Sequence, residues 1–228
     1  MLICFSCVLC VCQGNERSQL LEAIRAQIAL FKLQPSPAFI NKCVELYDTV
    51  LVRHGLMLVG SASAGKSQSL RTLQRAVTSL AGQGNLKQVN VSYINPKSIQ
   101  LNQLYGADNP ATLEWSDGVL PVLMRQCAIN ATTGTGSWEW VVFDGPVDAI
   151  WIENMNTVLD DNKKLCLASG EQIKLAPFQS MVFEVEDLAV ASPATVSRCG
   201  MVSKIQTAMR GCSDAQDVSL FLCFVPIC

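Results

Sequence analysis

Apolar residues recur at two different periods along the chain, and the change of period separates the expected helices from the expected strands. From Leu20 to Phe31 they return every three or four residues, which is the spacing of a helix with one buried face. A second stripe of this kind runs from Ile40 to Leu51, behind Ser36-Pro37, a pair typical of a helix start. Later, short apolar runs without a polar face predict strands that are buried on both sides.

Five apolar runs predict strands, and helical or turn-rich segments separate them. The expected strands are 55–60, 89–94, 138–144, 180–188 and 199–205, with helices over 69–80, 119–129 and 147–161 and a short capped helical turn over 192–198. The turn-rich stretch 95–118 predicts a long connection with room for a small hairpin, and Ser169-Gly170 favours a second hairpin. Strands that alternate with helices indicate an α/β fold, a parallel sheet flanked by helices.

Composition narrows the possible functions. The chain has 228 residues, half of them apolar, which is enough for one sizeable α/β domain or two small ones. Its net charge of -2, from 17 basic and 19 acidic residues, gives no electrostatic support for nucleic-acid binding. The 11 cysteines are an odd number in a long chain, unlike the disulfide framework of a small secreted domain. The only histidine, His54, stands just before a strand, where a surface or helix-end role is expected.

The first residues are apolar and rich in cysteine. Cys4, Cys7, Cys10 and Cys12 could suggest a metal site, but the chain lacks the second, distant ligand pair of a zinc site. A secretory signal would need a positive residue before the apolar run and a cleavage motif after it, and both are missing. The run is also too short to span a bilayer, so we expect no membrane role.

The segment GSASAGKS, from Gly60 to Ser67, matches the phosphate-loop pattern in full, with a buried strand before it and a helix after it. Small residues allow the backbone amides to turn inward as an anion nest, at the positive end of the following helix. Lys66 would place its ammonium on the outer phosphates of ATP, and Ser67 would offer its hydroxyl to Mg²⁺. The expected nucleotide-binding residues are Gly60, Ser61, Ala62, Ser63, Ala64, Gly65, Lys66, Ser67 and Gln68.

Asp144 ends the third expected strand, where a carboxylate can hold Mg²⁺ through water, so Ser67 and Asp144 are the expected metal residues. Many nucleotide-hydrolysing proteins carry a water-positioning carboxylate at the next position, which here is Gly145. Since general-base assistance contributes roughly 10²- to 10⁴-fold in rate, we expect slow or absent hydrolysis. The alternative is a stand-alone active P-loop ATPase in which Asp148 or Glu153 supplies the carboxylate.

Several blocks of sequence resemble the dynein heavy chains. They are 52–60, the phosphate loop, 93–106, 114–120, 141–175 and 183–202, and the resemblance as a whole covers roughly 33–202. The resemblance is to the second AAA+ module of the motor ring, in the style of axonemal dyneins. It implies an AAA+ large subdomain with hairpin inserts at Gln103–Trp115 and around Ser169-Gly170. It also implies a module that binds ATP without productive hydrolysis, and that shares the glycine after the strand aspartate.

The resemblance also suggests roles for residues outside the phosphate loop. Arg198, in SPATVSRCG, falls where AAA+ proteins place an arginine finger, directed at the nucleotide of the neighbouring module; the alternative is a surface arginine that caps a short helix. Glu186 and Asp187 would lie at the position of a polar sensor, and residues 33–35 would border the adenine. The implied partners are adjacent AAA+ modules, dynein intermediate and light chains, and microtubules. The implied location is the cytoplasm and cytoskeleton, in the axoneme of a cilium or flagellum.

The two ends of the chain do not resemble the family. We expect a divergent leader over 1–17, a nucleotide-binding domain over 18–204 and a divergent tail over 205–228, without the family's helical lid after the fifth strand. A third interpretation remains, in which the chain is a non-binding interaction module or a non-functional fragment of a longer motor chain.

Overall fold

A parallel sheet of five strands forms the centre of the computed structural model, which describes residues 5–84, 86–133, 136–188 and 191–203. The strand order is β2-β5-β8-β1-β9, and every neighbouring pair is parallel. These strands are β1 (Gly55–Val59), β2 (Val89–Ile94), β5 (Trp138–Asp144), β8 (Gln179–Val185) and β9 (Gly200–Ser203). The predicted α/β fold with a parallel sheet is therefore confirmed.

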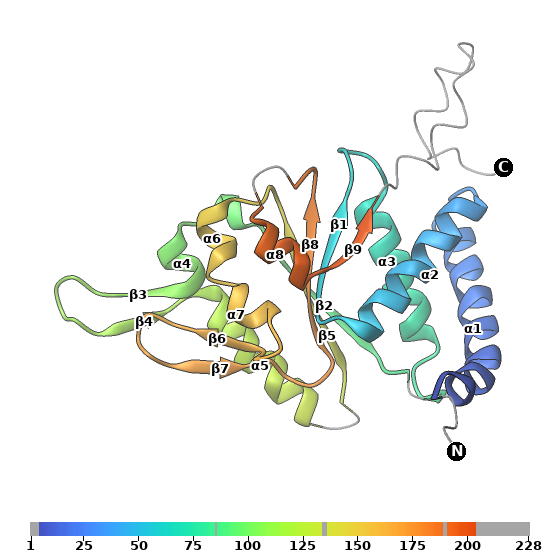
Figure 1. Cartoon of the computed structure of the whole chain (residues 1–228), viewed down its shortest axis with the longest axis horizontal. Helices are drawn as coiled ribbons and strands as arrows, with labels where there is room; N and C mark the ends of the chain where they lie inside the picture. Colours follow the sequence, from blue (N-terminus) through green and yellow to red (C-terminus); the bar gives the residue numbers. More distant parts are fainter. Residues whose placement is uncertain (1–4, 85, 134–135, 189–190, 204–228) are drawn as a thin grey trace, which may run out of the picture.

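Helices cover both faces of this sheet (Figure 1). One face packs against α1 (Phe5–Leu30), α2 (Pro37–Val52) and α3 (Lys66–Ser79). The other face packs against α4 (Leu101–Tyr105), α5 (Val119–Thr132), α6 (Ala149–Glu153), α7 (Asn156–Leu159) and the hairpin of β6 (Lys164–Cys166) and β7 (Gln172–Lys174). The hairpin of β3 (Gly106–Asp108) and β4 (Trp115–Asp117) extends beyond α4, and α8 (Pro193–Arg198) precedes β9.

Alternate residues of each strand point to opposite faces, so the described side chains form an apolar cluster on each side of the sheet. Phe143 and Phe183 belong to the cluster under α4–α7, where their rings stack with centroids 5.0 Å apart. Trp140, Val142 and Val182 belong to the cluster under α1–α3. Even-numbered residues of β5 and β8 therefore face α1–α3, which matters for the polar residues at the ends of these strands.

The hairpin expected at Gln103–Trp115 lies further along the chain. Residues 101–105 form α4 instead, because Gln100 and Gln103 cap each other's backbone and fix a helical turn. Gly106, with φ of 106°, ends that helix, and the hairpin begins there. The second expected hairpin, around Ser169-Gly170, is confirmed between β6 and β7.

The helix expected over 147–161 is interrupted. Asp148 caps the start of α6 by accepting a hydrogen bond from the Ile150 amide, but the helix ends at Glu153, and α7 begins only at Asn156. Asparagine at 154 and 156 is a weak helix former, while the buried stripe continues through both pieces. The strand expected over 180–188 ends at Val185, so Glu186 and Asp187 lie in the exposed turn after it.

The predicted ends of the domain are only partly described. Helix α1 begins at Phe5 and so crosses the expected boundary after residue 17. Cys4, the tail 205–228 and with them the expected absence of a lid lie outside the described residues, as do the side chains of Cys7, Cys10 and Cys12. Within the described ranges, no three metal-ligating side chains cluster, and no helix has the length and apolar character needed to cross a bilayer.

Candidate functional site

The loop from Gly60 to Gly65 joins β1 to α3 and has the curled backbone expected of an anion nest. Its start is tied to the centre of the sheet, because the Gly60 amide donates to the carbonyl of Val185 at 3.1 Å. Ser63 and Gly65 both adopt left-handed conformations, with φ of 62° and 84°. Glycine suits the second of these positions, since it carries no Cβ. The turned amides and the start of a 14-residue helix therefore meet at one point, which favours a bound anion.

Lys66 and Ser67 form the first turn of α3. The Lys66 ammonium donates to the carbonyl oxygens of Gly60 and Ser61, at 2.5 and 2.9 Å, so its charge lies on the loop itself. The Ser67 hydroxyl does not donate to Asp144; it donates to Glu184, at 2.5 Å. The loop therefore presents a cation and a hydroxyl side by side, as the sequence motif predicts.

Glu184 is the residue of this site that sequence reasoning missed. It lies on β8, directly between Leu58 of β1 and Asp144 of β5, and it is only 4 % exposed. Burial raises the pKa of Glu184 and the neighbouring Asp144 adds to the rise, while the Ser67 hydrogen bond and Lys66 lower it. A glutamate inside the apolar run SMVFEV was the available signal, since its even position places it on the face toward α3.

Gly145 follows Asp144 at the exposed end of β5. A Cβ at this position would lie 3.3 Å from Asn95 Oδ1 and 3.4 Å from Pro96 Cδ, so the space for a side chain is narrow. The two carboxylates considered as substitutes, Asp148 and Glu153, lie at the two ends of α6. Asp148 caps α6, and Glu153 is exposed at the end of that helix.

Arg198 is the last residue of α8 and interacts within its own chain. Its Nε lies 3.2 Å from Asp160 Oδ1, and its Nη1 donates to the carbonyl of Ala194 at 2.9 Å. Both contacts fit the interpretation of an arginine that closes a short helix. The side chain is 32% exposed, however, so it also remains within reach of another protein surface. Its role as a finger stays a prediction.

The segment expected to border the adenine is the loop between α1 and α2. Leu33 is buried against α2 and α3 in the cluster under that face, whereas Gln34 and Pro35 are exposed. Cys43 of α2 also contacts the start of α3, through a hydrogen bond from its thiol to the Ser69 carbonyl. The loop thus lies on helices that connect to the phosphate loop, and its contact with a base stays a prediction.

The residues present fit ATP with Mg²⁺. The nest and the Lys66 ammonium suit phosphate oxygens, and the Ser67 hydroxyl with the Asp144 carboxylate offers the hard oxygen ligands that Mg²⁺ takes. Glu184 Oε1 is buried and has no hydrogen-bond partner among the residues that the structure describes. A buried, unpaired carboxylate oxygen beside this hydroxyl indicates a place prepared for positive charge.

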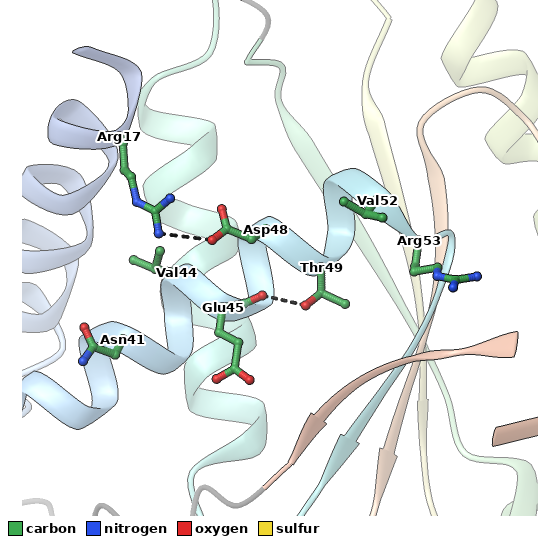
Figure 2. Close-up of a pocket in the computed structure, with 8 residues that line it drawn as sticks. All are labelled: Arg17, Asn41, Val44, Glu45, Asp48, Thr49, Val52 and Arg53. Carbon is green, nitrogen blue, oxygen red and sulfur yellow. Dashed lines mark hydrogen bonds and ion pairs between the residues drawn. The ribbon is translucent and has the colours of Figure 1, made fainter. Parts of the chain in front are cut away.

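A groove of about 460 Å³ lies elsewhere, on the outer face of α2 (Figure 2). Arg17 of α1 reaches across it to Asp48, at 3.2 Å, and Thr49 donates to the carbonyl of Glu45. It shares no lining residue with the phosphate loop. Val44 and Val52 also line it, so the groove has a mixed polar and apolar character.

Comparison with known proteins gives a consistent result. A family model described as the hydrolytic ATP binding site of the dynein motor region matches residues 5–67. Dynein axonemal heavy chain 1 of Homo sapiens is 56% identical over 186 residues, 79% of this chain and 4% of that protein. Dynein axonemal heavy chain 3 of Mus musculus is 49% identical over 184 residues, which cover 80% of this chain and 4% of that protein. Dynein axonemal heavy chain 12 of Homo sapiens is 46% identical over 186 residues, which cover 81% of this chain and 6% of that protein.

Proposed function

We propose, since this chain carries an ATP-binding AAA+ domain of the axonemal dynein heavy-chain motor region, that it is the second AAA+ module of such a motor and holds ATP with Mg²⁺ while hydrolysing it little or not at all. The chain spans only 4% to 6% of the length of these relatives, so motor activity belongs to the proposal for a longer parent.

The observation that carries the proposal is the geometry of the phosphate loop. Lys66 and Ser67 stand at the N-terminus of α3, behind a backbone that turns inward at Ser63 and Gly65. When bound, Mg²⁺ would neutralise phosphate charge beside Ser67 and Asp144. The chain's own residues bind and orient the triphosphate, and these tasks need no catalytic base.

Slow hydrolysis follows from Gly145. The matching family model is described as hydrolytic, but its match ends at Ser67, well before Asp144 and the position that follows it. Gly145 offers no group to orient an attacking water, and the Asp148 carboxylate is engaged at a helix start. The alternative, an active stand-alone ATPase, would then depend on Glu153, which is exposed at the end of α6.

The same proposal assigns Arg198 to a neighbouring module, as a guanidinium that stabilises charge on the phosphoryl group transferred there. Its exposure at the end of α8 supports this role, and release from Asp160 would be required. The partners would be adjacent AAA+ modules and, through a longer parent, dynein intermediate and light chains and microtubules. The location would be the cytoskeleton of a cilium or flagellum.

A binding experiment on the full chain tests the proposal. Fluorescent methylanthraniloyl-ATP is titrated with Mg²⁺ present, against the wild-type chain and Lys66→Ala. We expect saturable binding by the wild type and a loss of at least tenfold in affinity for Lys66→Ala, because a charge-assisted contact to phosphate is removed. Lys174→Ala, at an exposed position of β7, is the matched control and should bind like the wild type.

Two results would contradict the proposal. The first is a wild-type chain that is folded by circular dichroism and binds no adenine nucleotide. The second is single-turnover hydrolysis of ATP at an ordinary enzymatic rate, since this would require a base that the structure does not place at Gly145.

A further inference from the structure

Glu184 is a charged residue in the middle of the sheet, on the strand between the phosphate-loop strand and the Asp144 strand. Its Cα pairs with Leu58 on one side and with Asp144 on the other. Val182, two residues earlier, packs under α1–α3, so Glu184 faces the same side and reaches the first turn of α3. Its placement is thus fixed by strand register rather than by a flexible loop.

A buried carboxylate lowers stability unless positive charge or hydrogen bonds compensate it. Glu184 is 4 % exposed and accepts a hydrogen bond from Ser67 through one oxygen. The other oxygen, Oε1, is buried without a hydrogen-bond partner in the described part of the chain. Asp144 adds a second negative charge next to it, while Lys66 and Arg71 offset part of the charge of Glu184 without a hydrogen bond to Oε1.

The hydrogen bond from Ser67 sets the orientation of that hydroxyl. A serine hydroxyl has one proton and two lone pairs, and here the proton goes to Glu184. The lone pairs therefore remain for a ligand in the site. A group that fixes the direction of a metal-binding hydroxyl acts in the same manner as the outer partners of metal ligands in other proteins.

We propose that Glu184 is the second carboxylate of the magnesium site, a positioning residue that orients the Ser67 hydroxyl and adds negative charge beside Asp144. The inference rests on the proposed function, because it concerns the divalent cation that accompanies the nucleotide. Two carboxylates next to a triphosphate repel it when no cation is present. Nucleotide binding by this chain therefore depends steeply on a divalent cation.

The competing interpretation is that Glu184 is the missing general base, and the contacts of Glu184 do not support it. The oxygen that faces the loop accepts the Ser67 proton, which places it on the side of the metal-binding hydroxyl. A base would have to reach a water beside the phosphate that is transferred, and the position for that is occupied by Gly145.

The test compares the full wild-type chain with Glu184→Gln, which keeps the shape and removes the charge. Methylanthraniloyl-ATP binding is measured over a series of free Mg²⁺ concentrations and in EDTA, and Mn²⁺ binding with ATP present is followed by electron paramagnetic resonance. In Glu184→Gln we expect the apparent affinity for Mg²⁺ or Mn²⁺ to fall about tenfold or more. Its affinity in EDTA should equal or exceed that of the wild type, because a negative charge near the phosphates is gone.

Two further variants keep the test decisive. Glu114→Gln, between β3 and β4 at an exposed position, removes the same charge away from the site and should leave every measurement unchanged. A double-mutant cycle of Glu184→Gln with Ser67→Ala should show strong coupling in metal affinity, because the first side chain acts through the second. If Glu184→Gln fails to fold, Glu184→Asp replaces it, since the shorter side chain keeps the charge and loses the contact with Ser67.

The possible failures are distinguishable. A folded wild-type chain that binds no nucleotide at all overturns the proposed function, and the inference with it. Nucleotide binding with equal cation dependence in wild type and Glu184→Gln overturns the inference alone. Loss of ATP turnover in Glu184→Gln without a change in cation affinity would instead assign Glu184 as a base, which also overturns it.

Discussion

Gly145 provides the sharpest test of why this site should hold ATP without cleaving it. The perturbation is Gly145→Glu, which restores a carboxylate directly after Asp144. The backbone allows a side chain, because Gly145 does not adopt a left-handed conformation. Steric space is the limiting factor, and the contacts with Asn95 and Pro96 determine how much remains.

The structure gives the size of the steric cost. The new Cβ would lie 3.3 Å from Asn95 Oδ1 and 3.4 Å from Pro96 Cδ, so the neighbours must move by a few tenths of an ångström. Asn95 is exposed, and its side-chain oxygen accepts a hydrogen bond from the Lys97 amide at 3.0 Å, so this side chain can move at the cost of one contact. Pro96 is buried and less free to move. The carboxylate should therefore enter the site slightly displaced from an ideal position.

The expected rate of ATP hydrolysis by Gly145→Glu follows from the gain due to a general base and the loss due to its displacement. A well-placed general base contributes roughly 10²- to 10⁴-fold, which is about 2.7 to 5.4 kcal/mol of barrier. A misplacement of about 1 Å can remove about 10²-fold of this. A displacement of a full ångström would leave a gain of roughly 1- to 100-fold, and the displacement here is only a few tenths of an ångström. We therefore expect Gly145→Glu to hydrolyse bound ATP faster than the wild type, by up to roughly 100-fold.

Single-turnover hydrolysis of radiolabelled ATP by excess protein measures this rate without interference from product release. Gly145→Gln has the same shape without a basic group and is the control that isolates the carboxylate. Equal rates for Gly145→Glu and Gly145→Gln, with both variants binding ATP like the wild type, would refute the reasoning that the absent carboxylate limits hydrolysis.

Further expectations concern reactivity and stability. Cys166 is exposed, while burial raises the pKa of the Cys43 thiol to about 12, so iodoacetamide should modify Cys166 long before Cys43, as judged by peptide mass spectrometry on native protein. Burial and, to a smaller extent, the nearby Lys163 lower the pKa of His54 in the folded protein. The neutral imidazole therefore contributes to stability in full at a pH above 6.5, the pKa of the unfolded state. That contribution should be lost as the pH falls from 6.5 through the lower folded-state pKa, and urea unfolding of His54→Asn should lack this part of the pH dependence. Phe183→Ala should cost about 3–5 kcal/mol in the free energy of unfolding, because it leaves a cavity against Phe143; a loss below about 1 kcal/mol would contradict the stacked core.

The phosphate loop and Asp144 could be predicted because each depends on residues that are contiguous in the sequence. Gly60 to Ser67 carries the whole nest, and the apolar run before Asp144 specifies a buried strand by itself. The alternation of strands and helices then required a parallel sheet with its carboxyl ends together, so the two parts had to meet. A local sequence pattern was sufficient for prediction wherever one segment contained both the secondary-structure element and its functional residues.

Other features depend on contacts that no local pattern contains. The Ser67–Glu184 hydrogen bond joins residues 117 positions apart, and it exists because strand register sets β8 beside β1. Helix α4 is too short for a periodic signal, and a reciprocal pair of glutamine contacts fixes it instead. The break after Glu153 likewise escapes a periodicity argument, because the buried stripe of α6 continues into α7 without a change of spacing.

Strand β8 is made after both of its neighbours, and this has a consequence for biosynthesis. The ribosome releases β1 and β5 before β8. In the folded sheet β8 lies between these two strands, so it must insert between them after they have been made. Until residues 179–185 emerge, the loop and Asp144 have no common scaffold, and the Gly60 amide lacks its acceptor at Val185. The capacity to hold ATP should thus arise in a single late step of synthesis, when the central strand closes the gap.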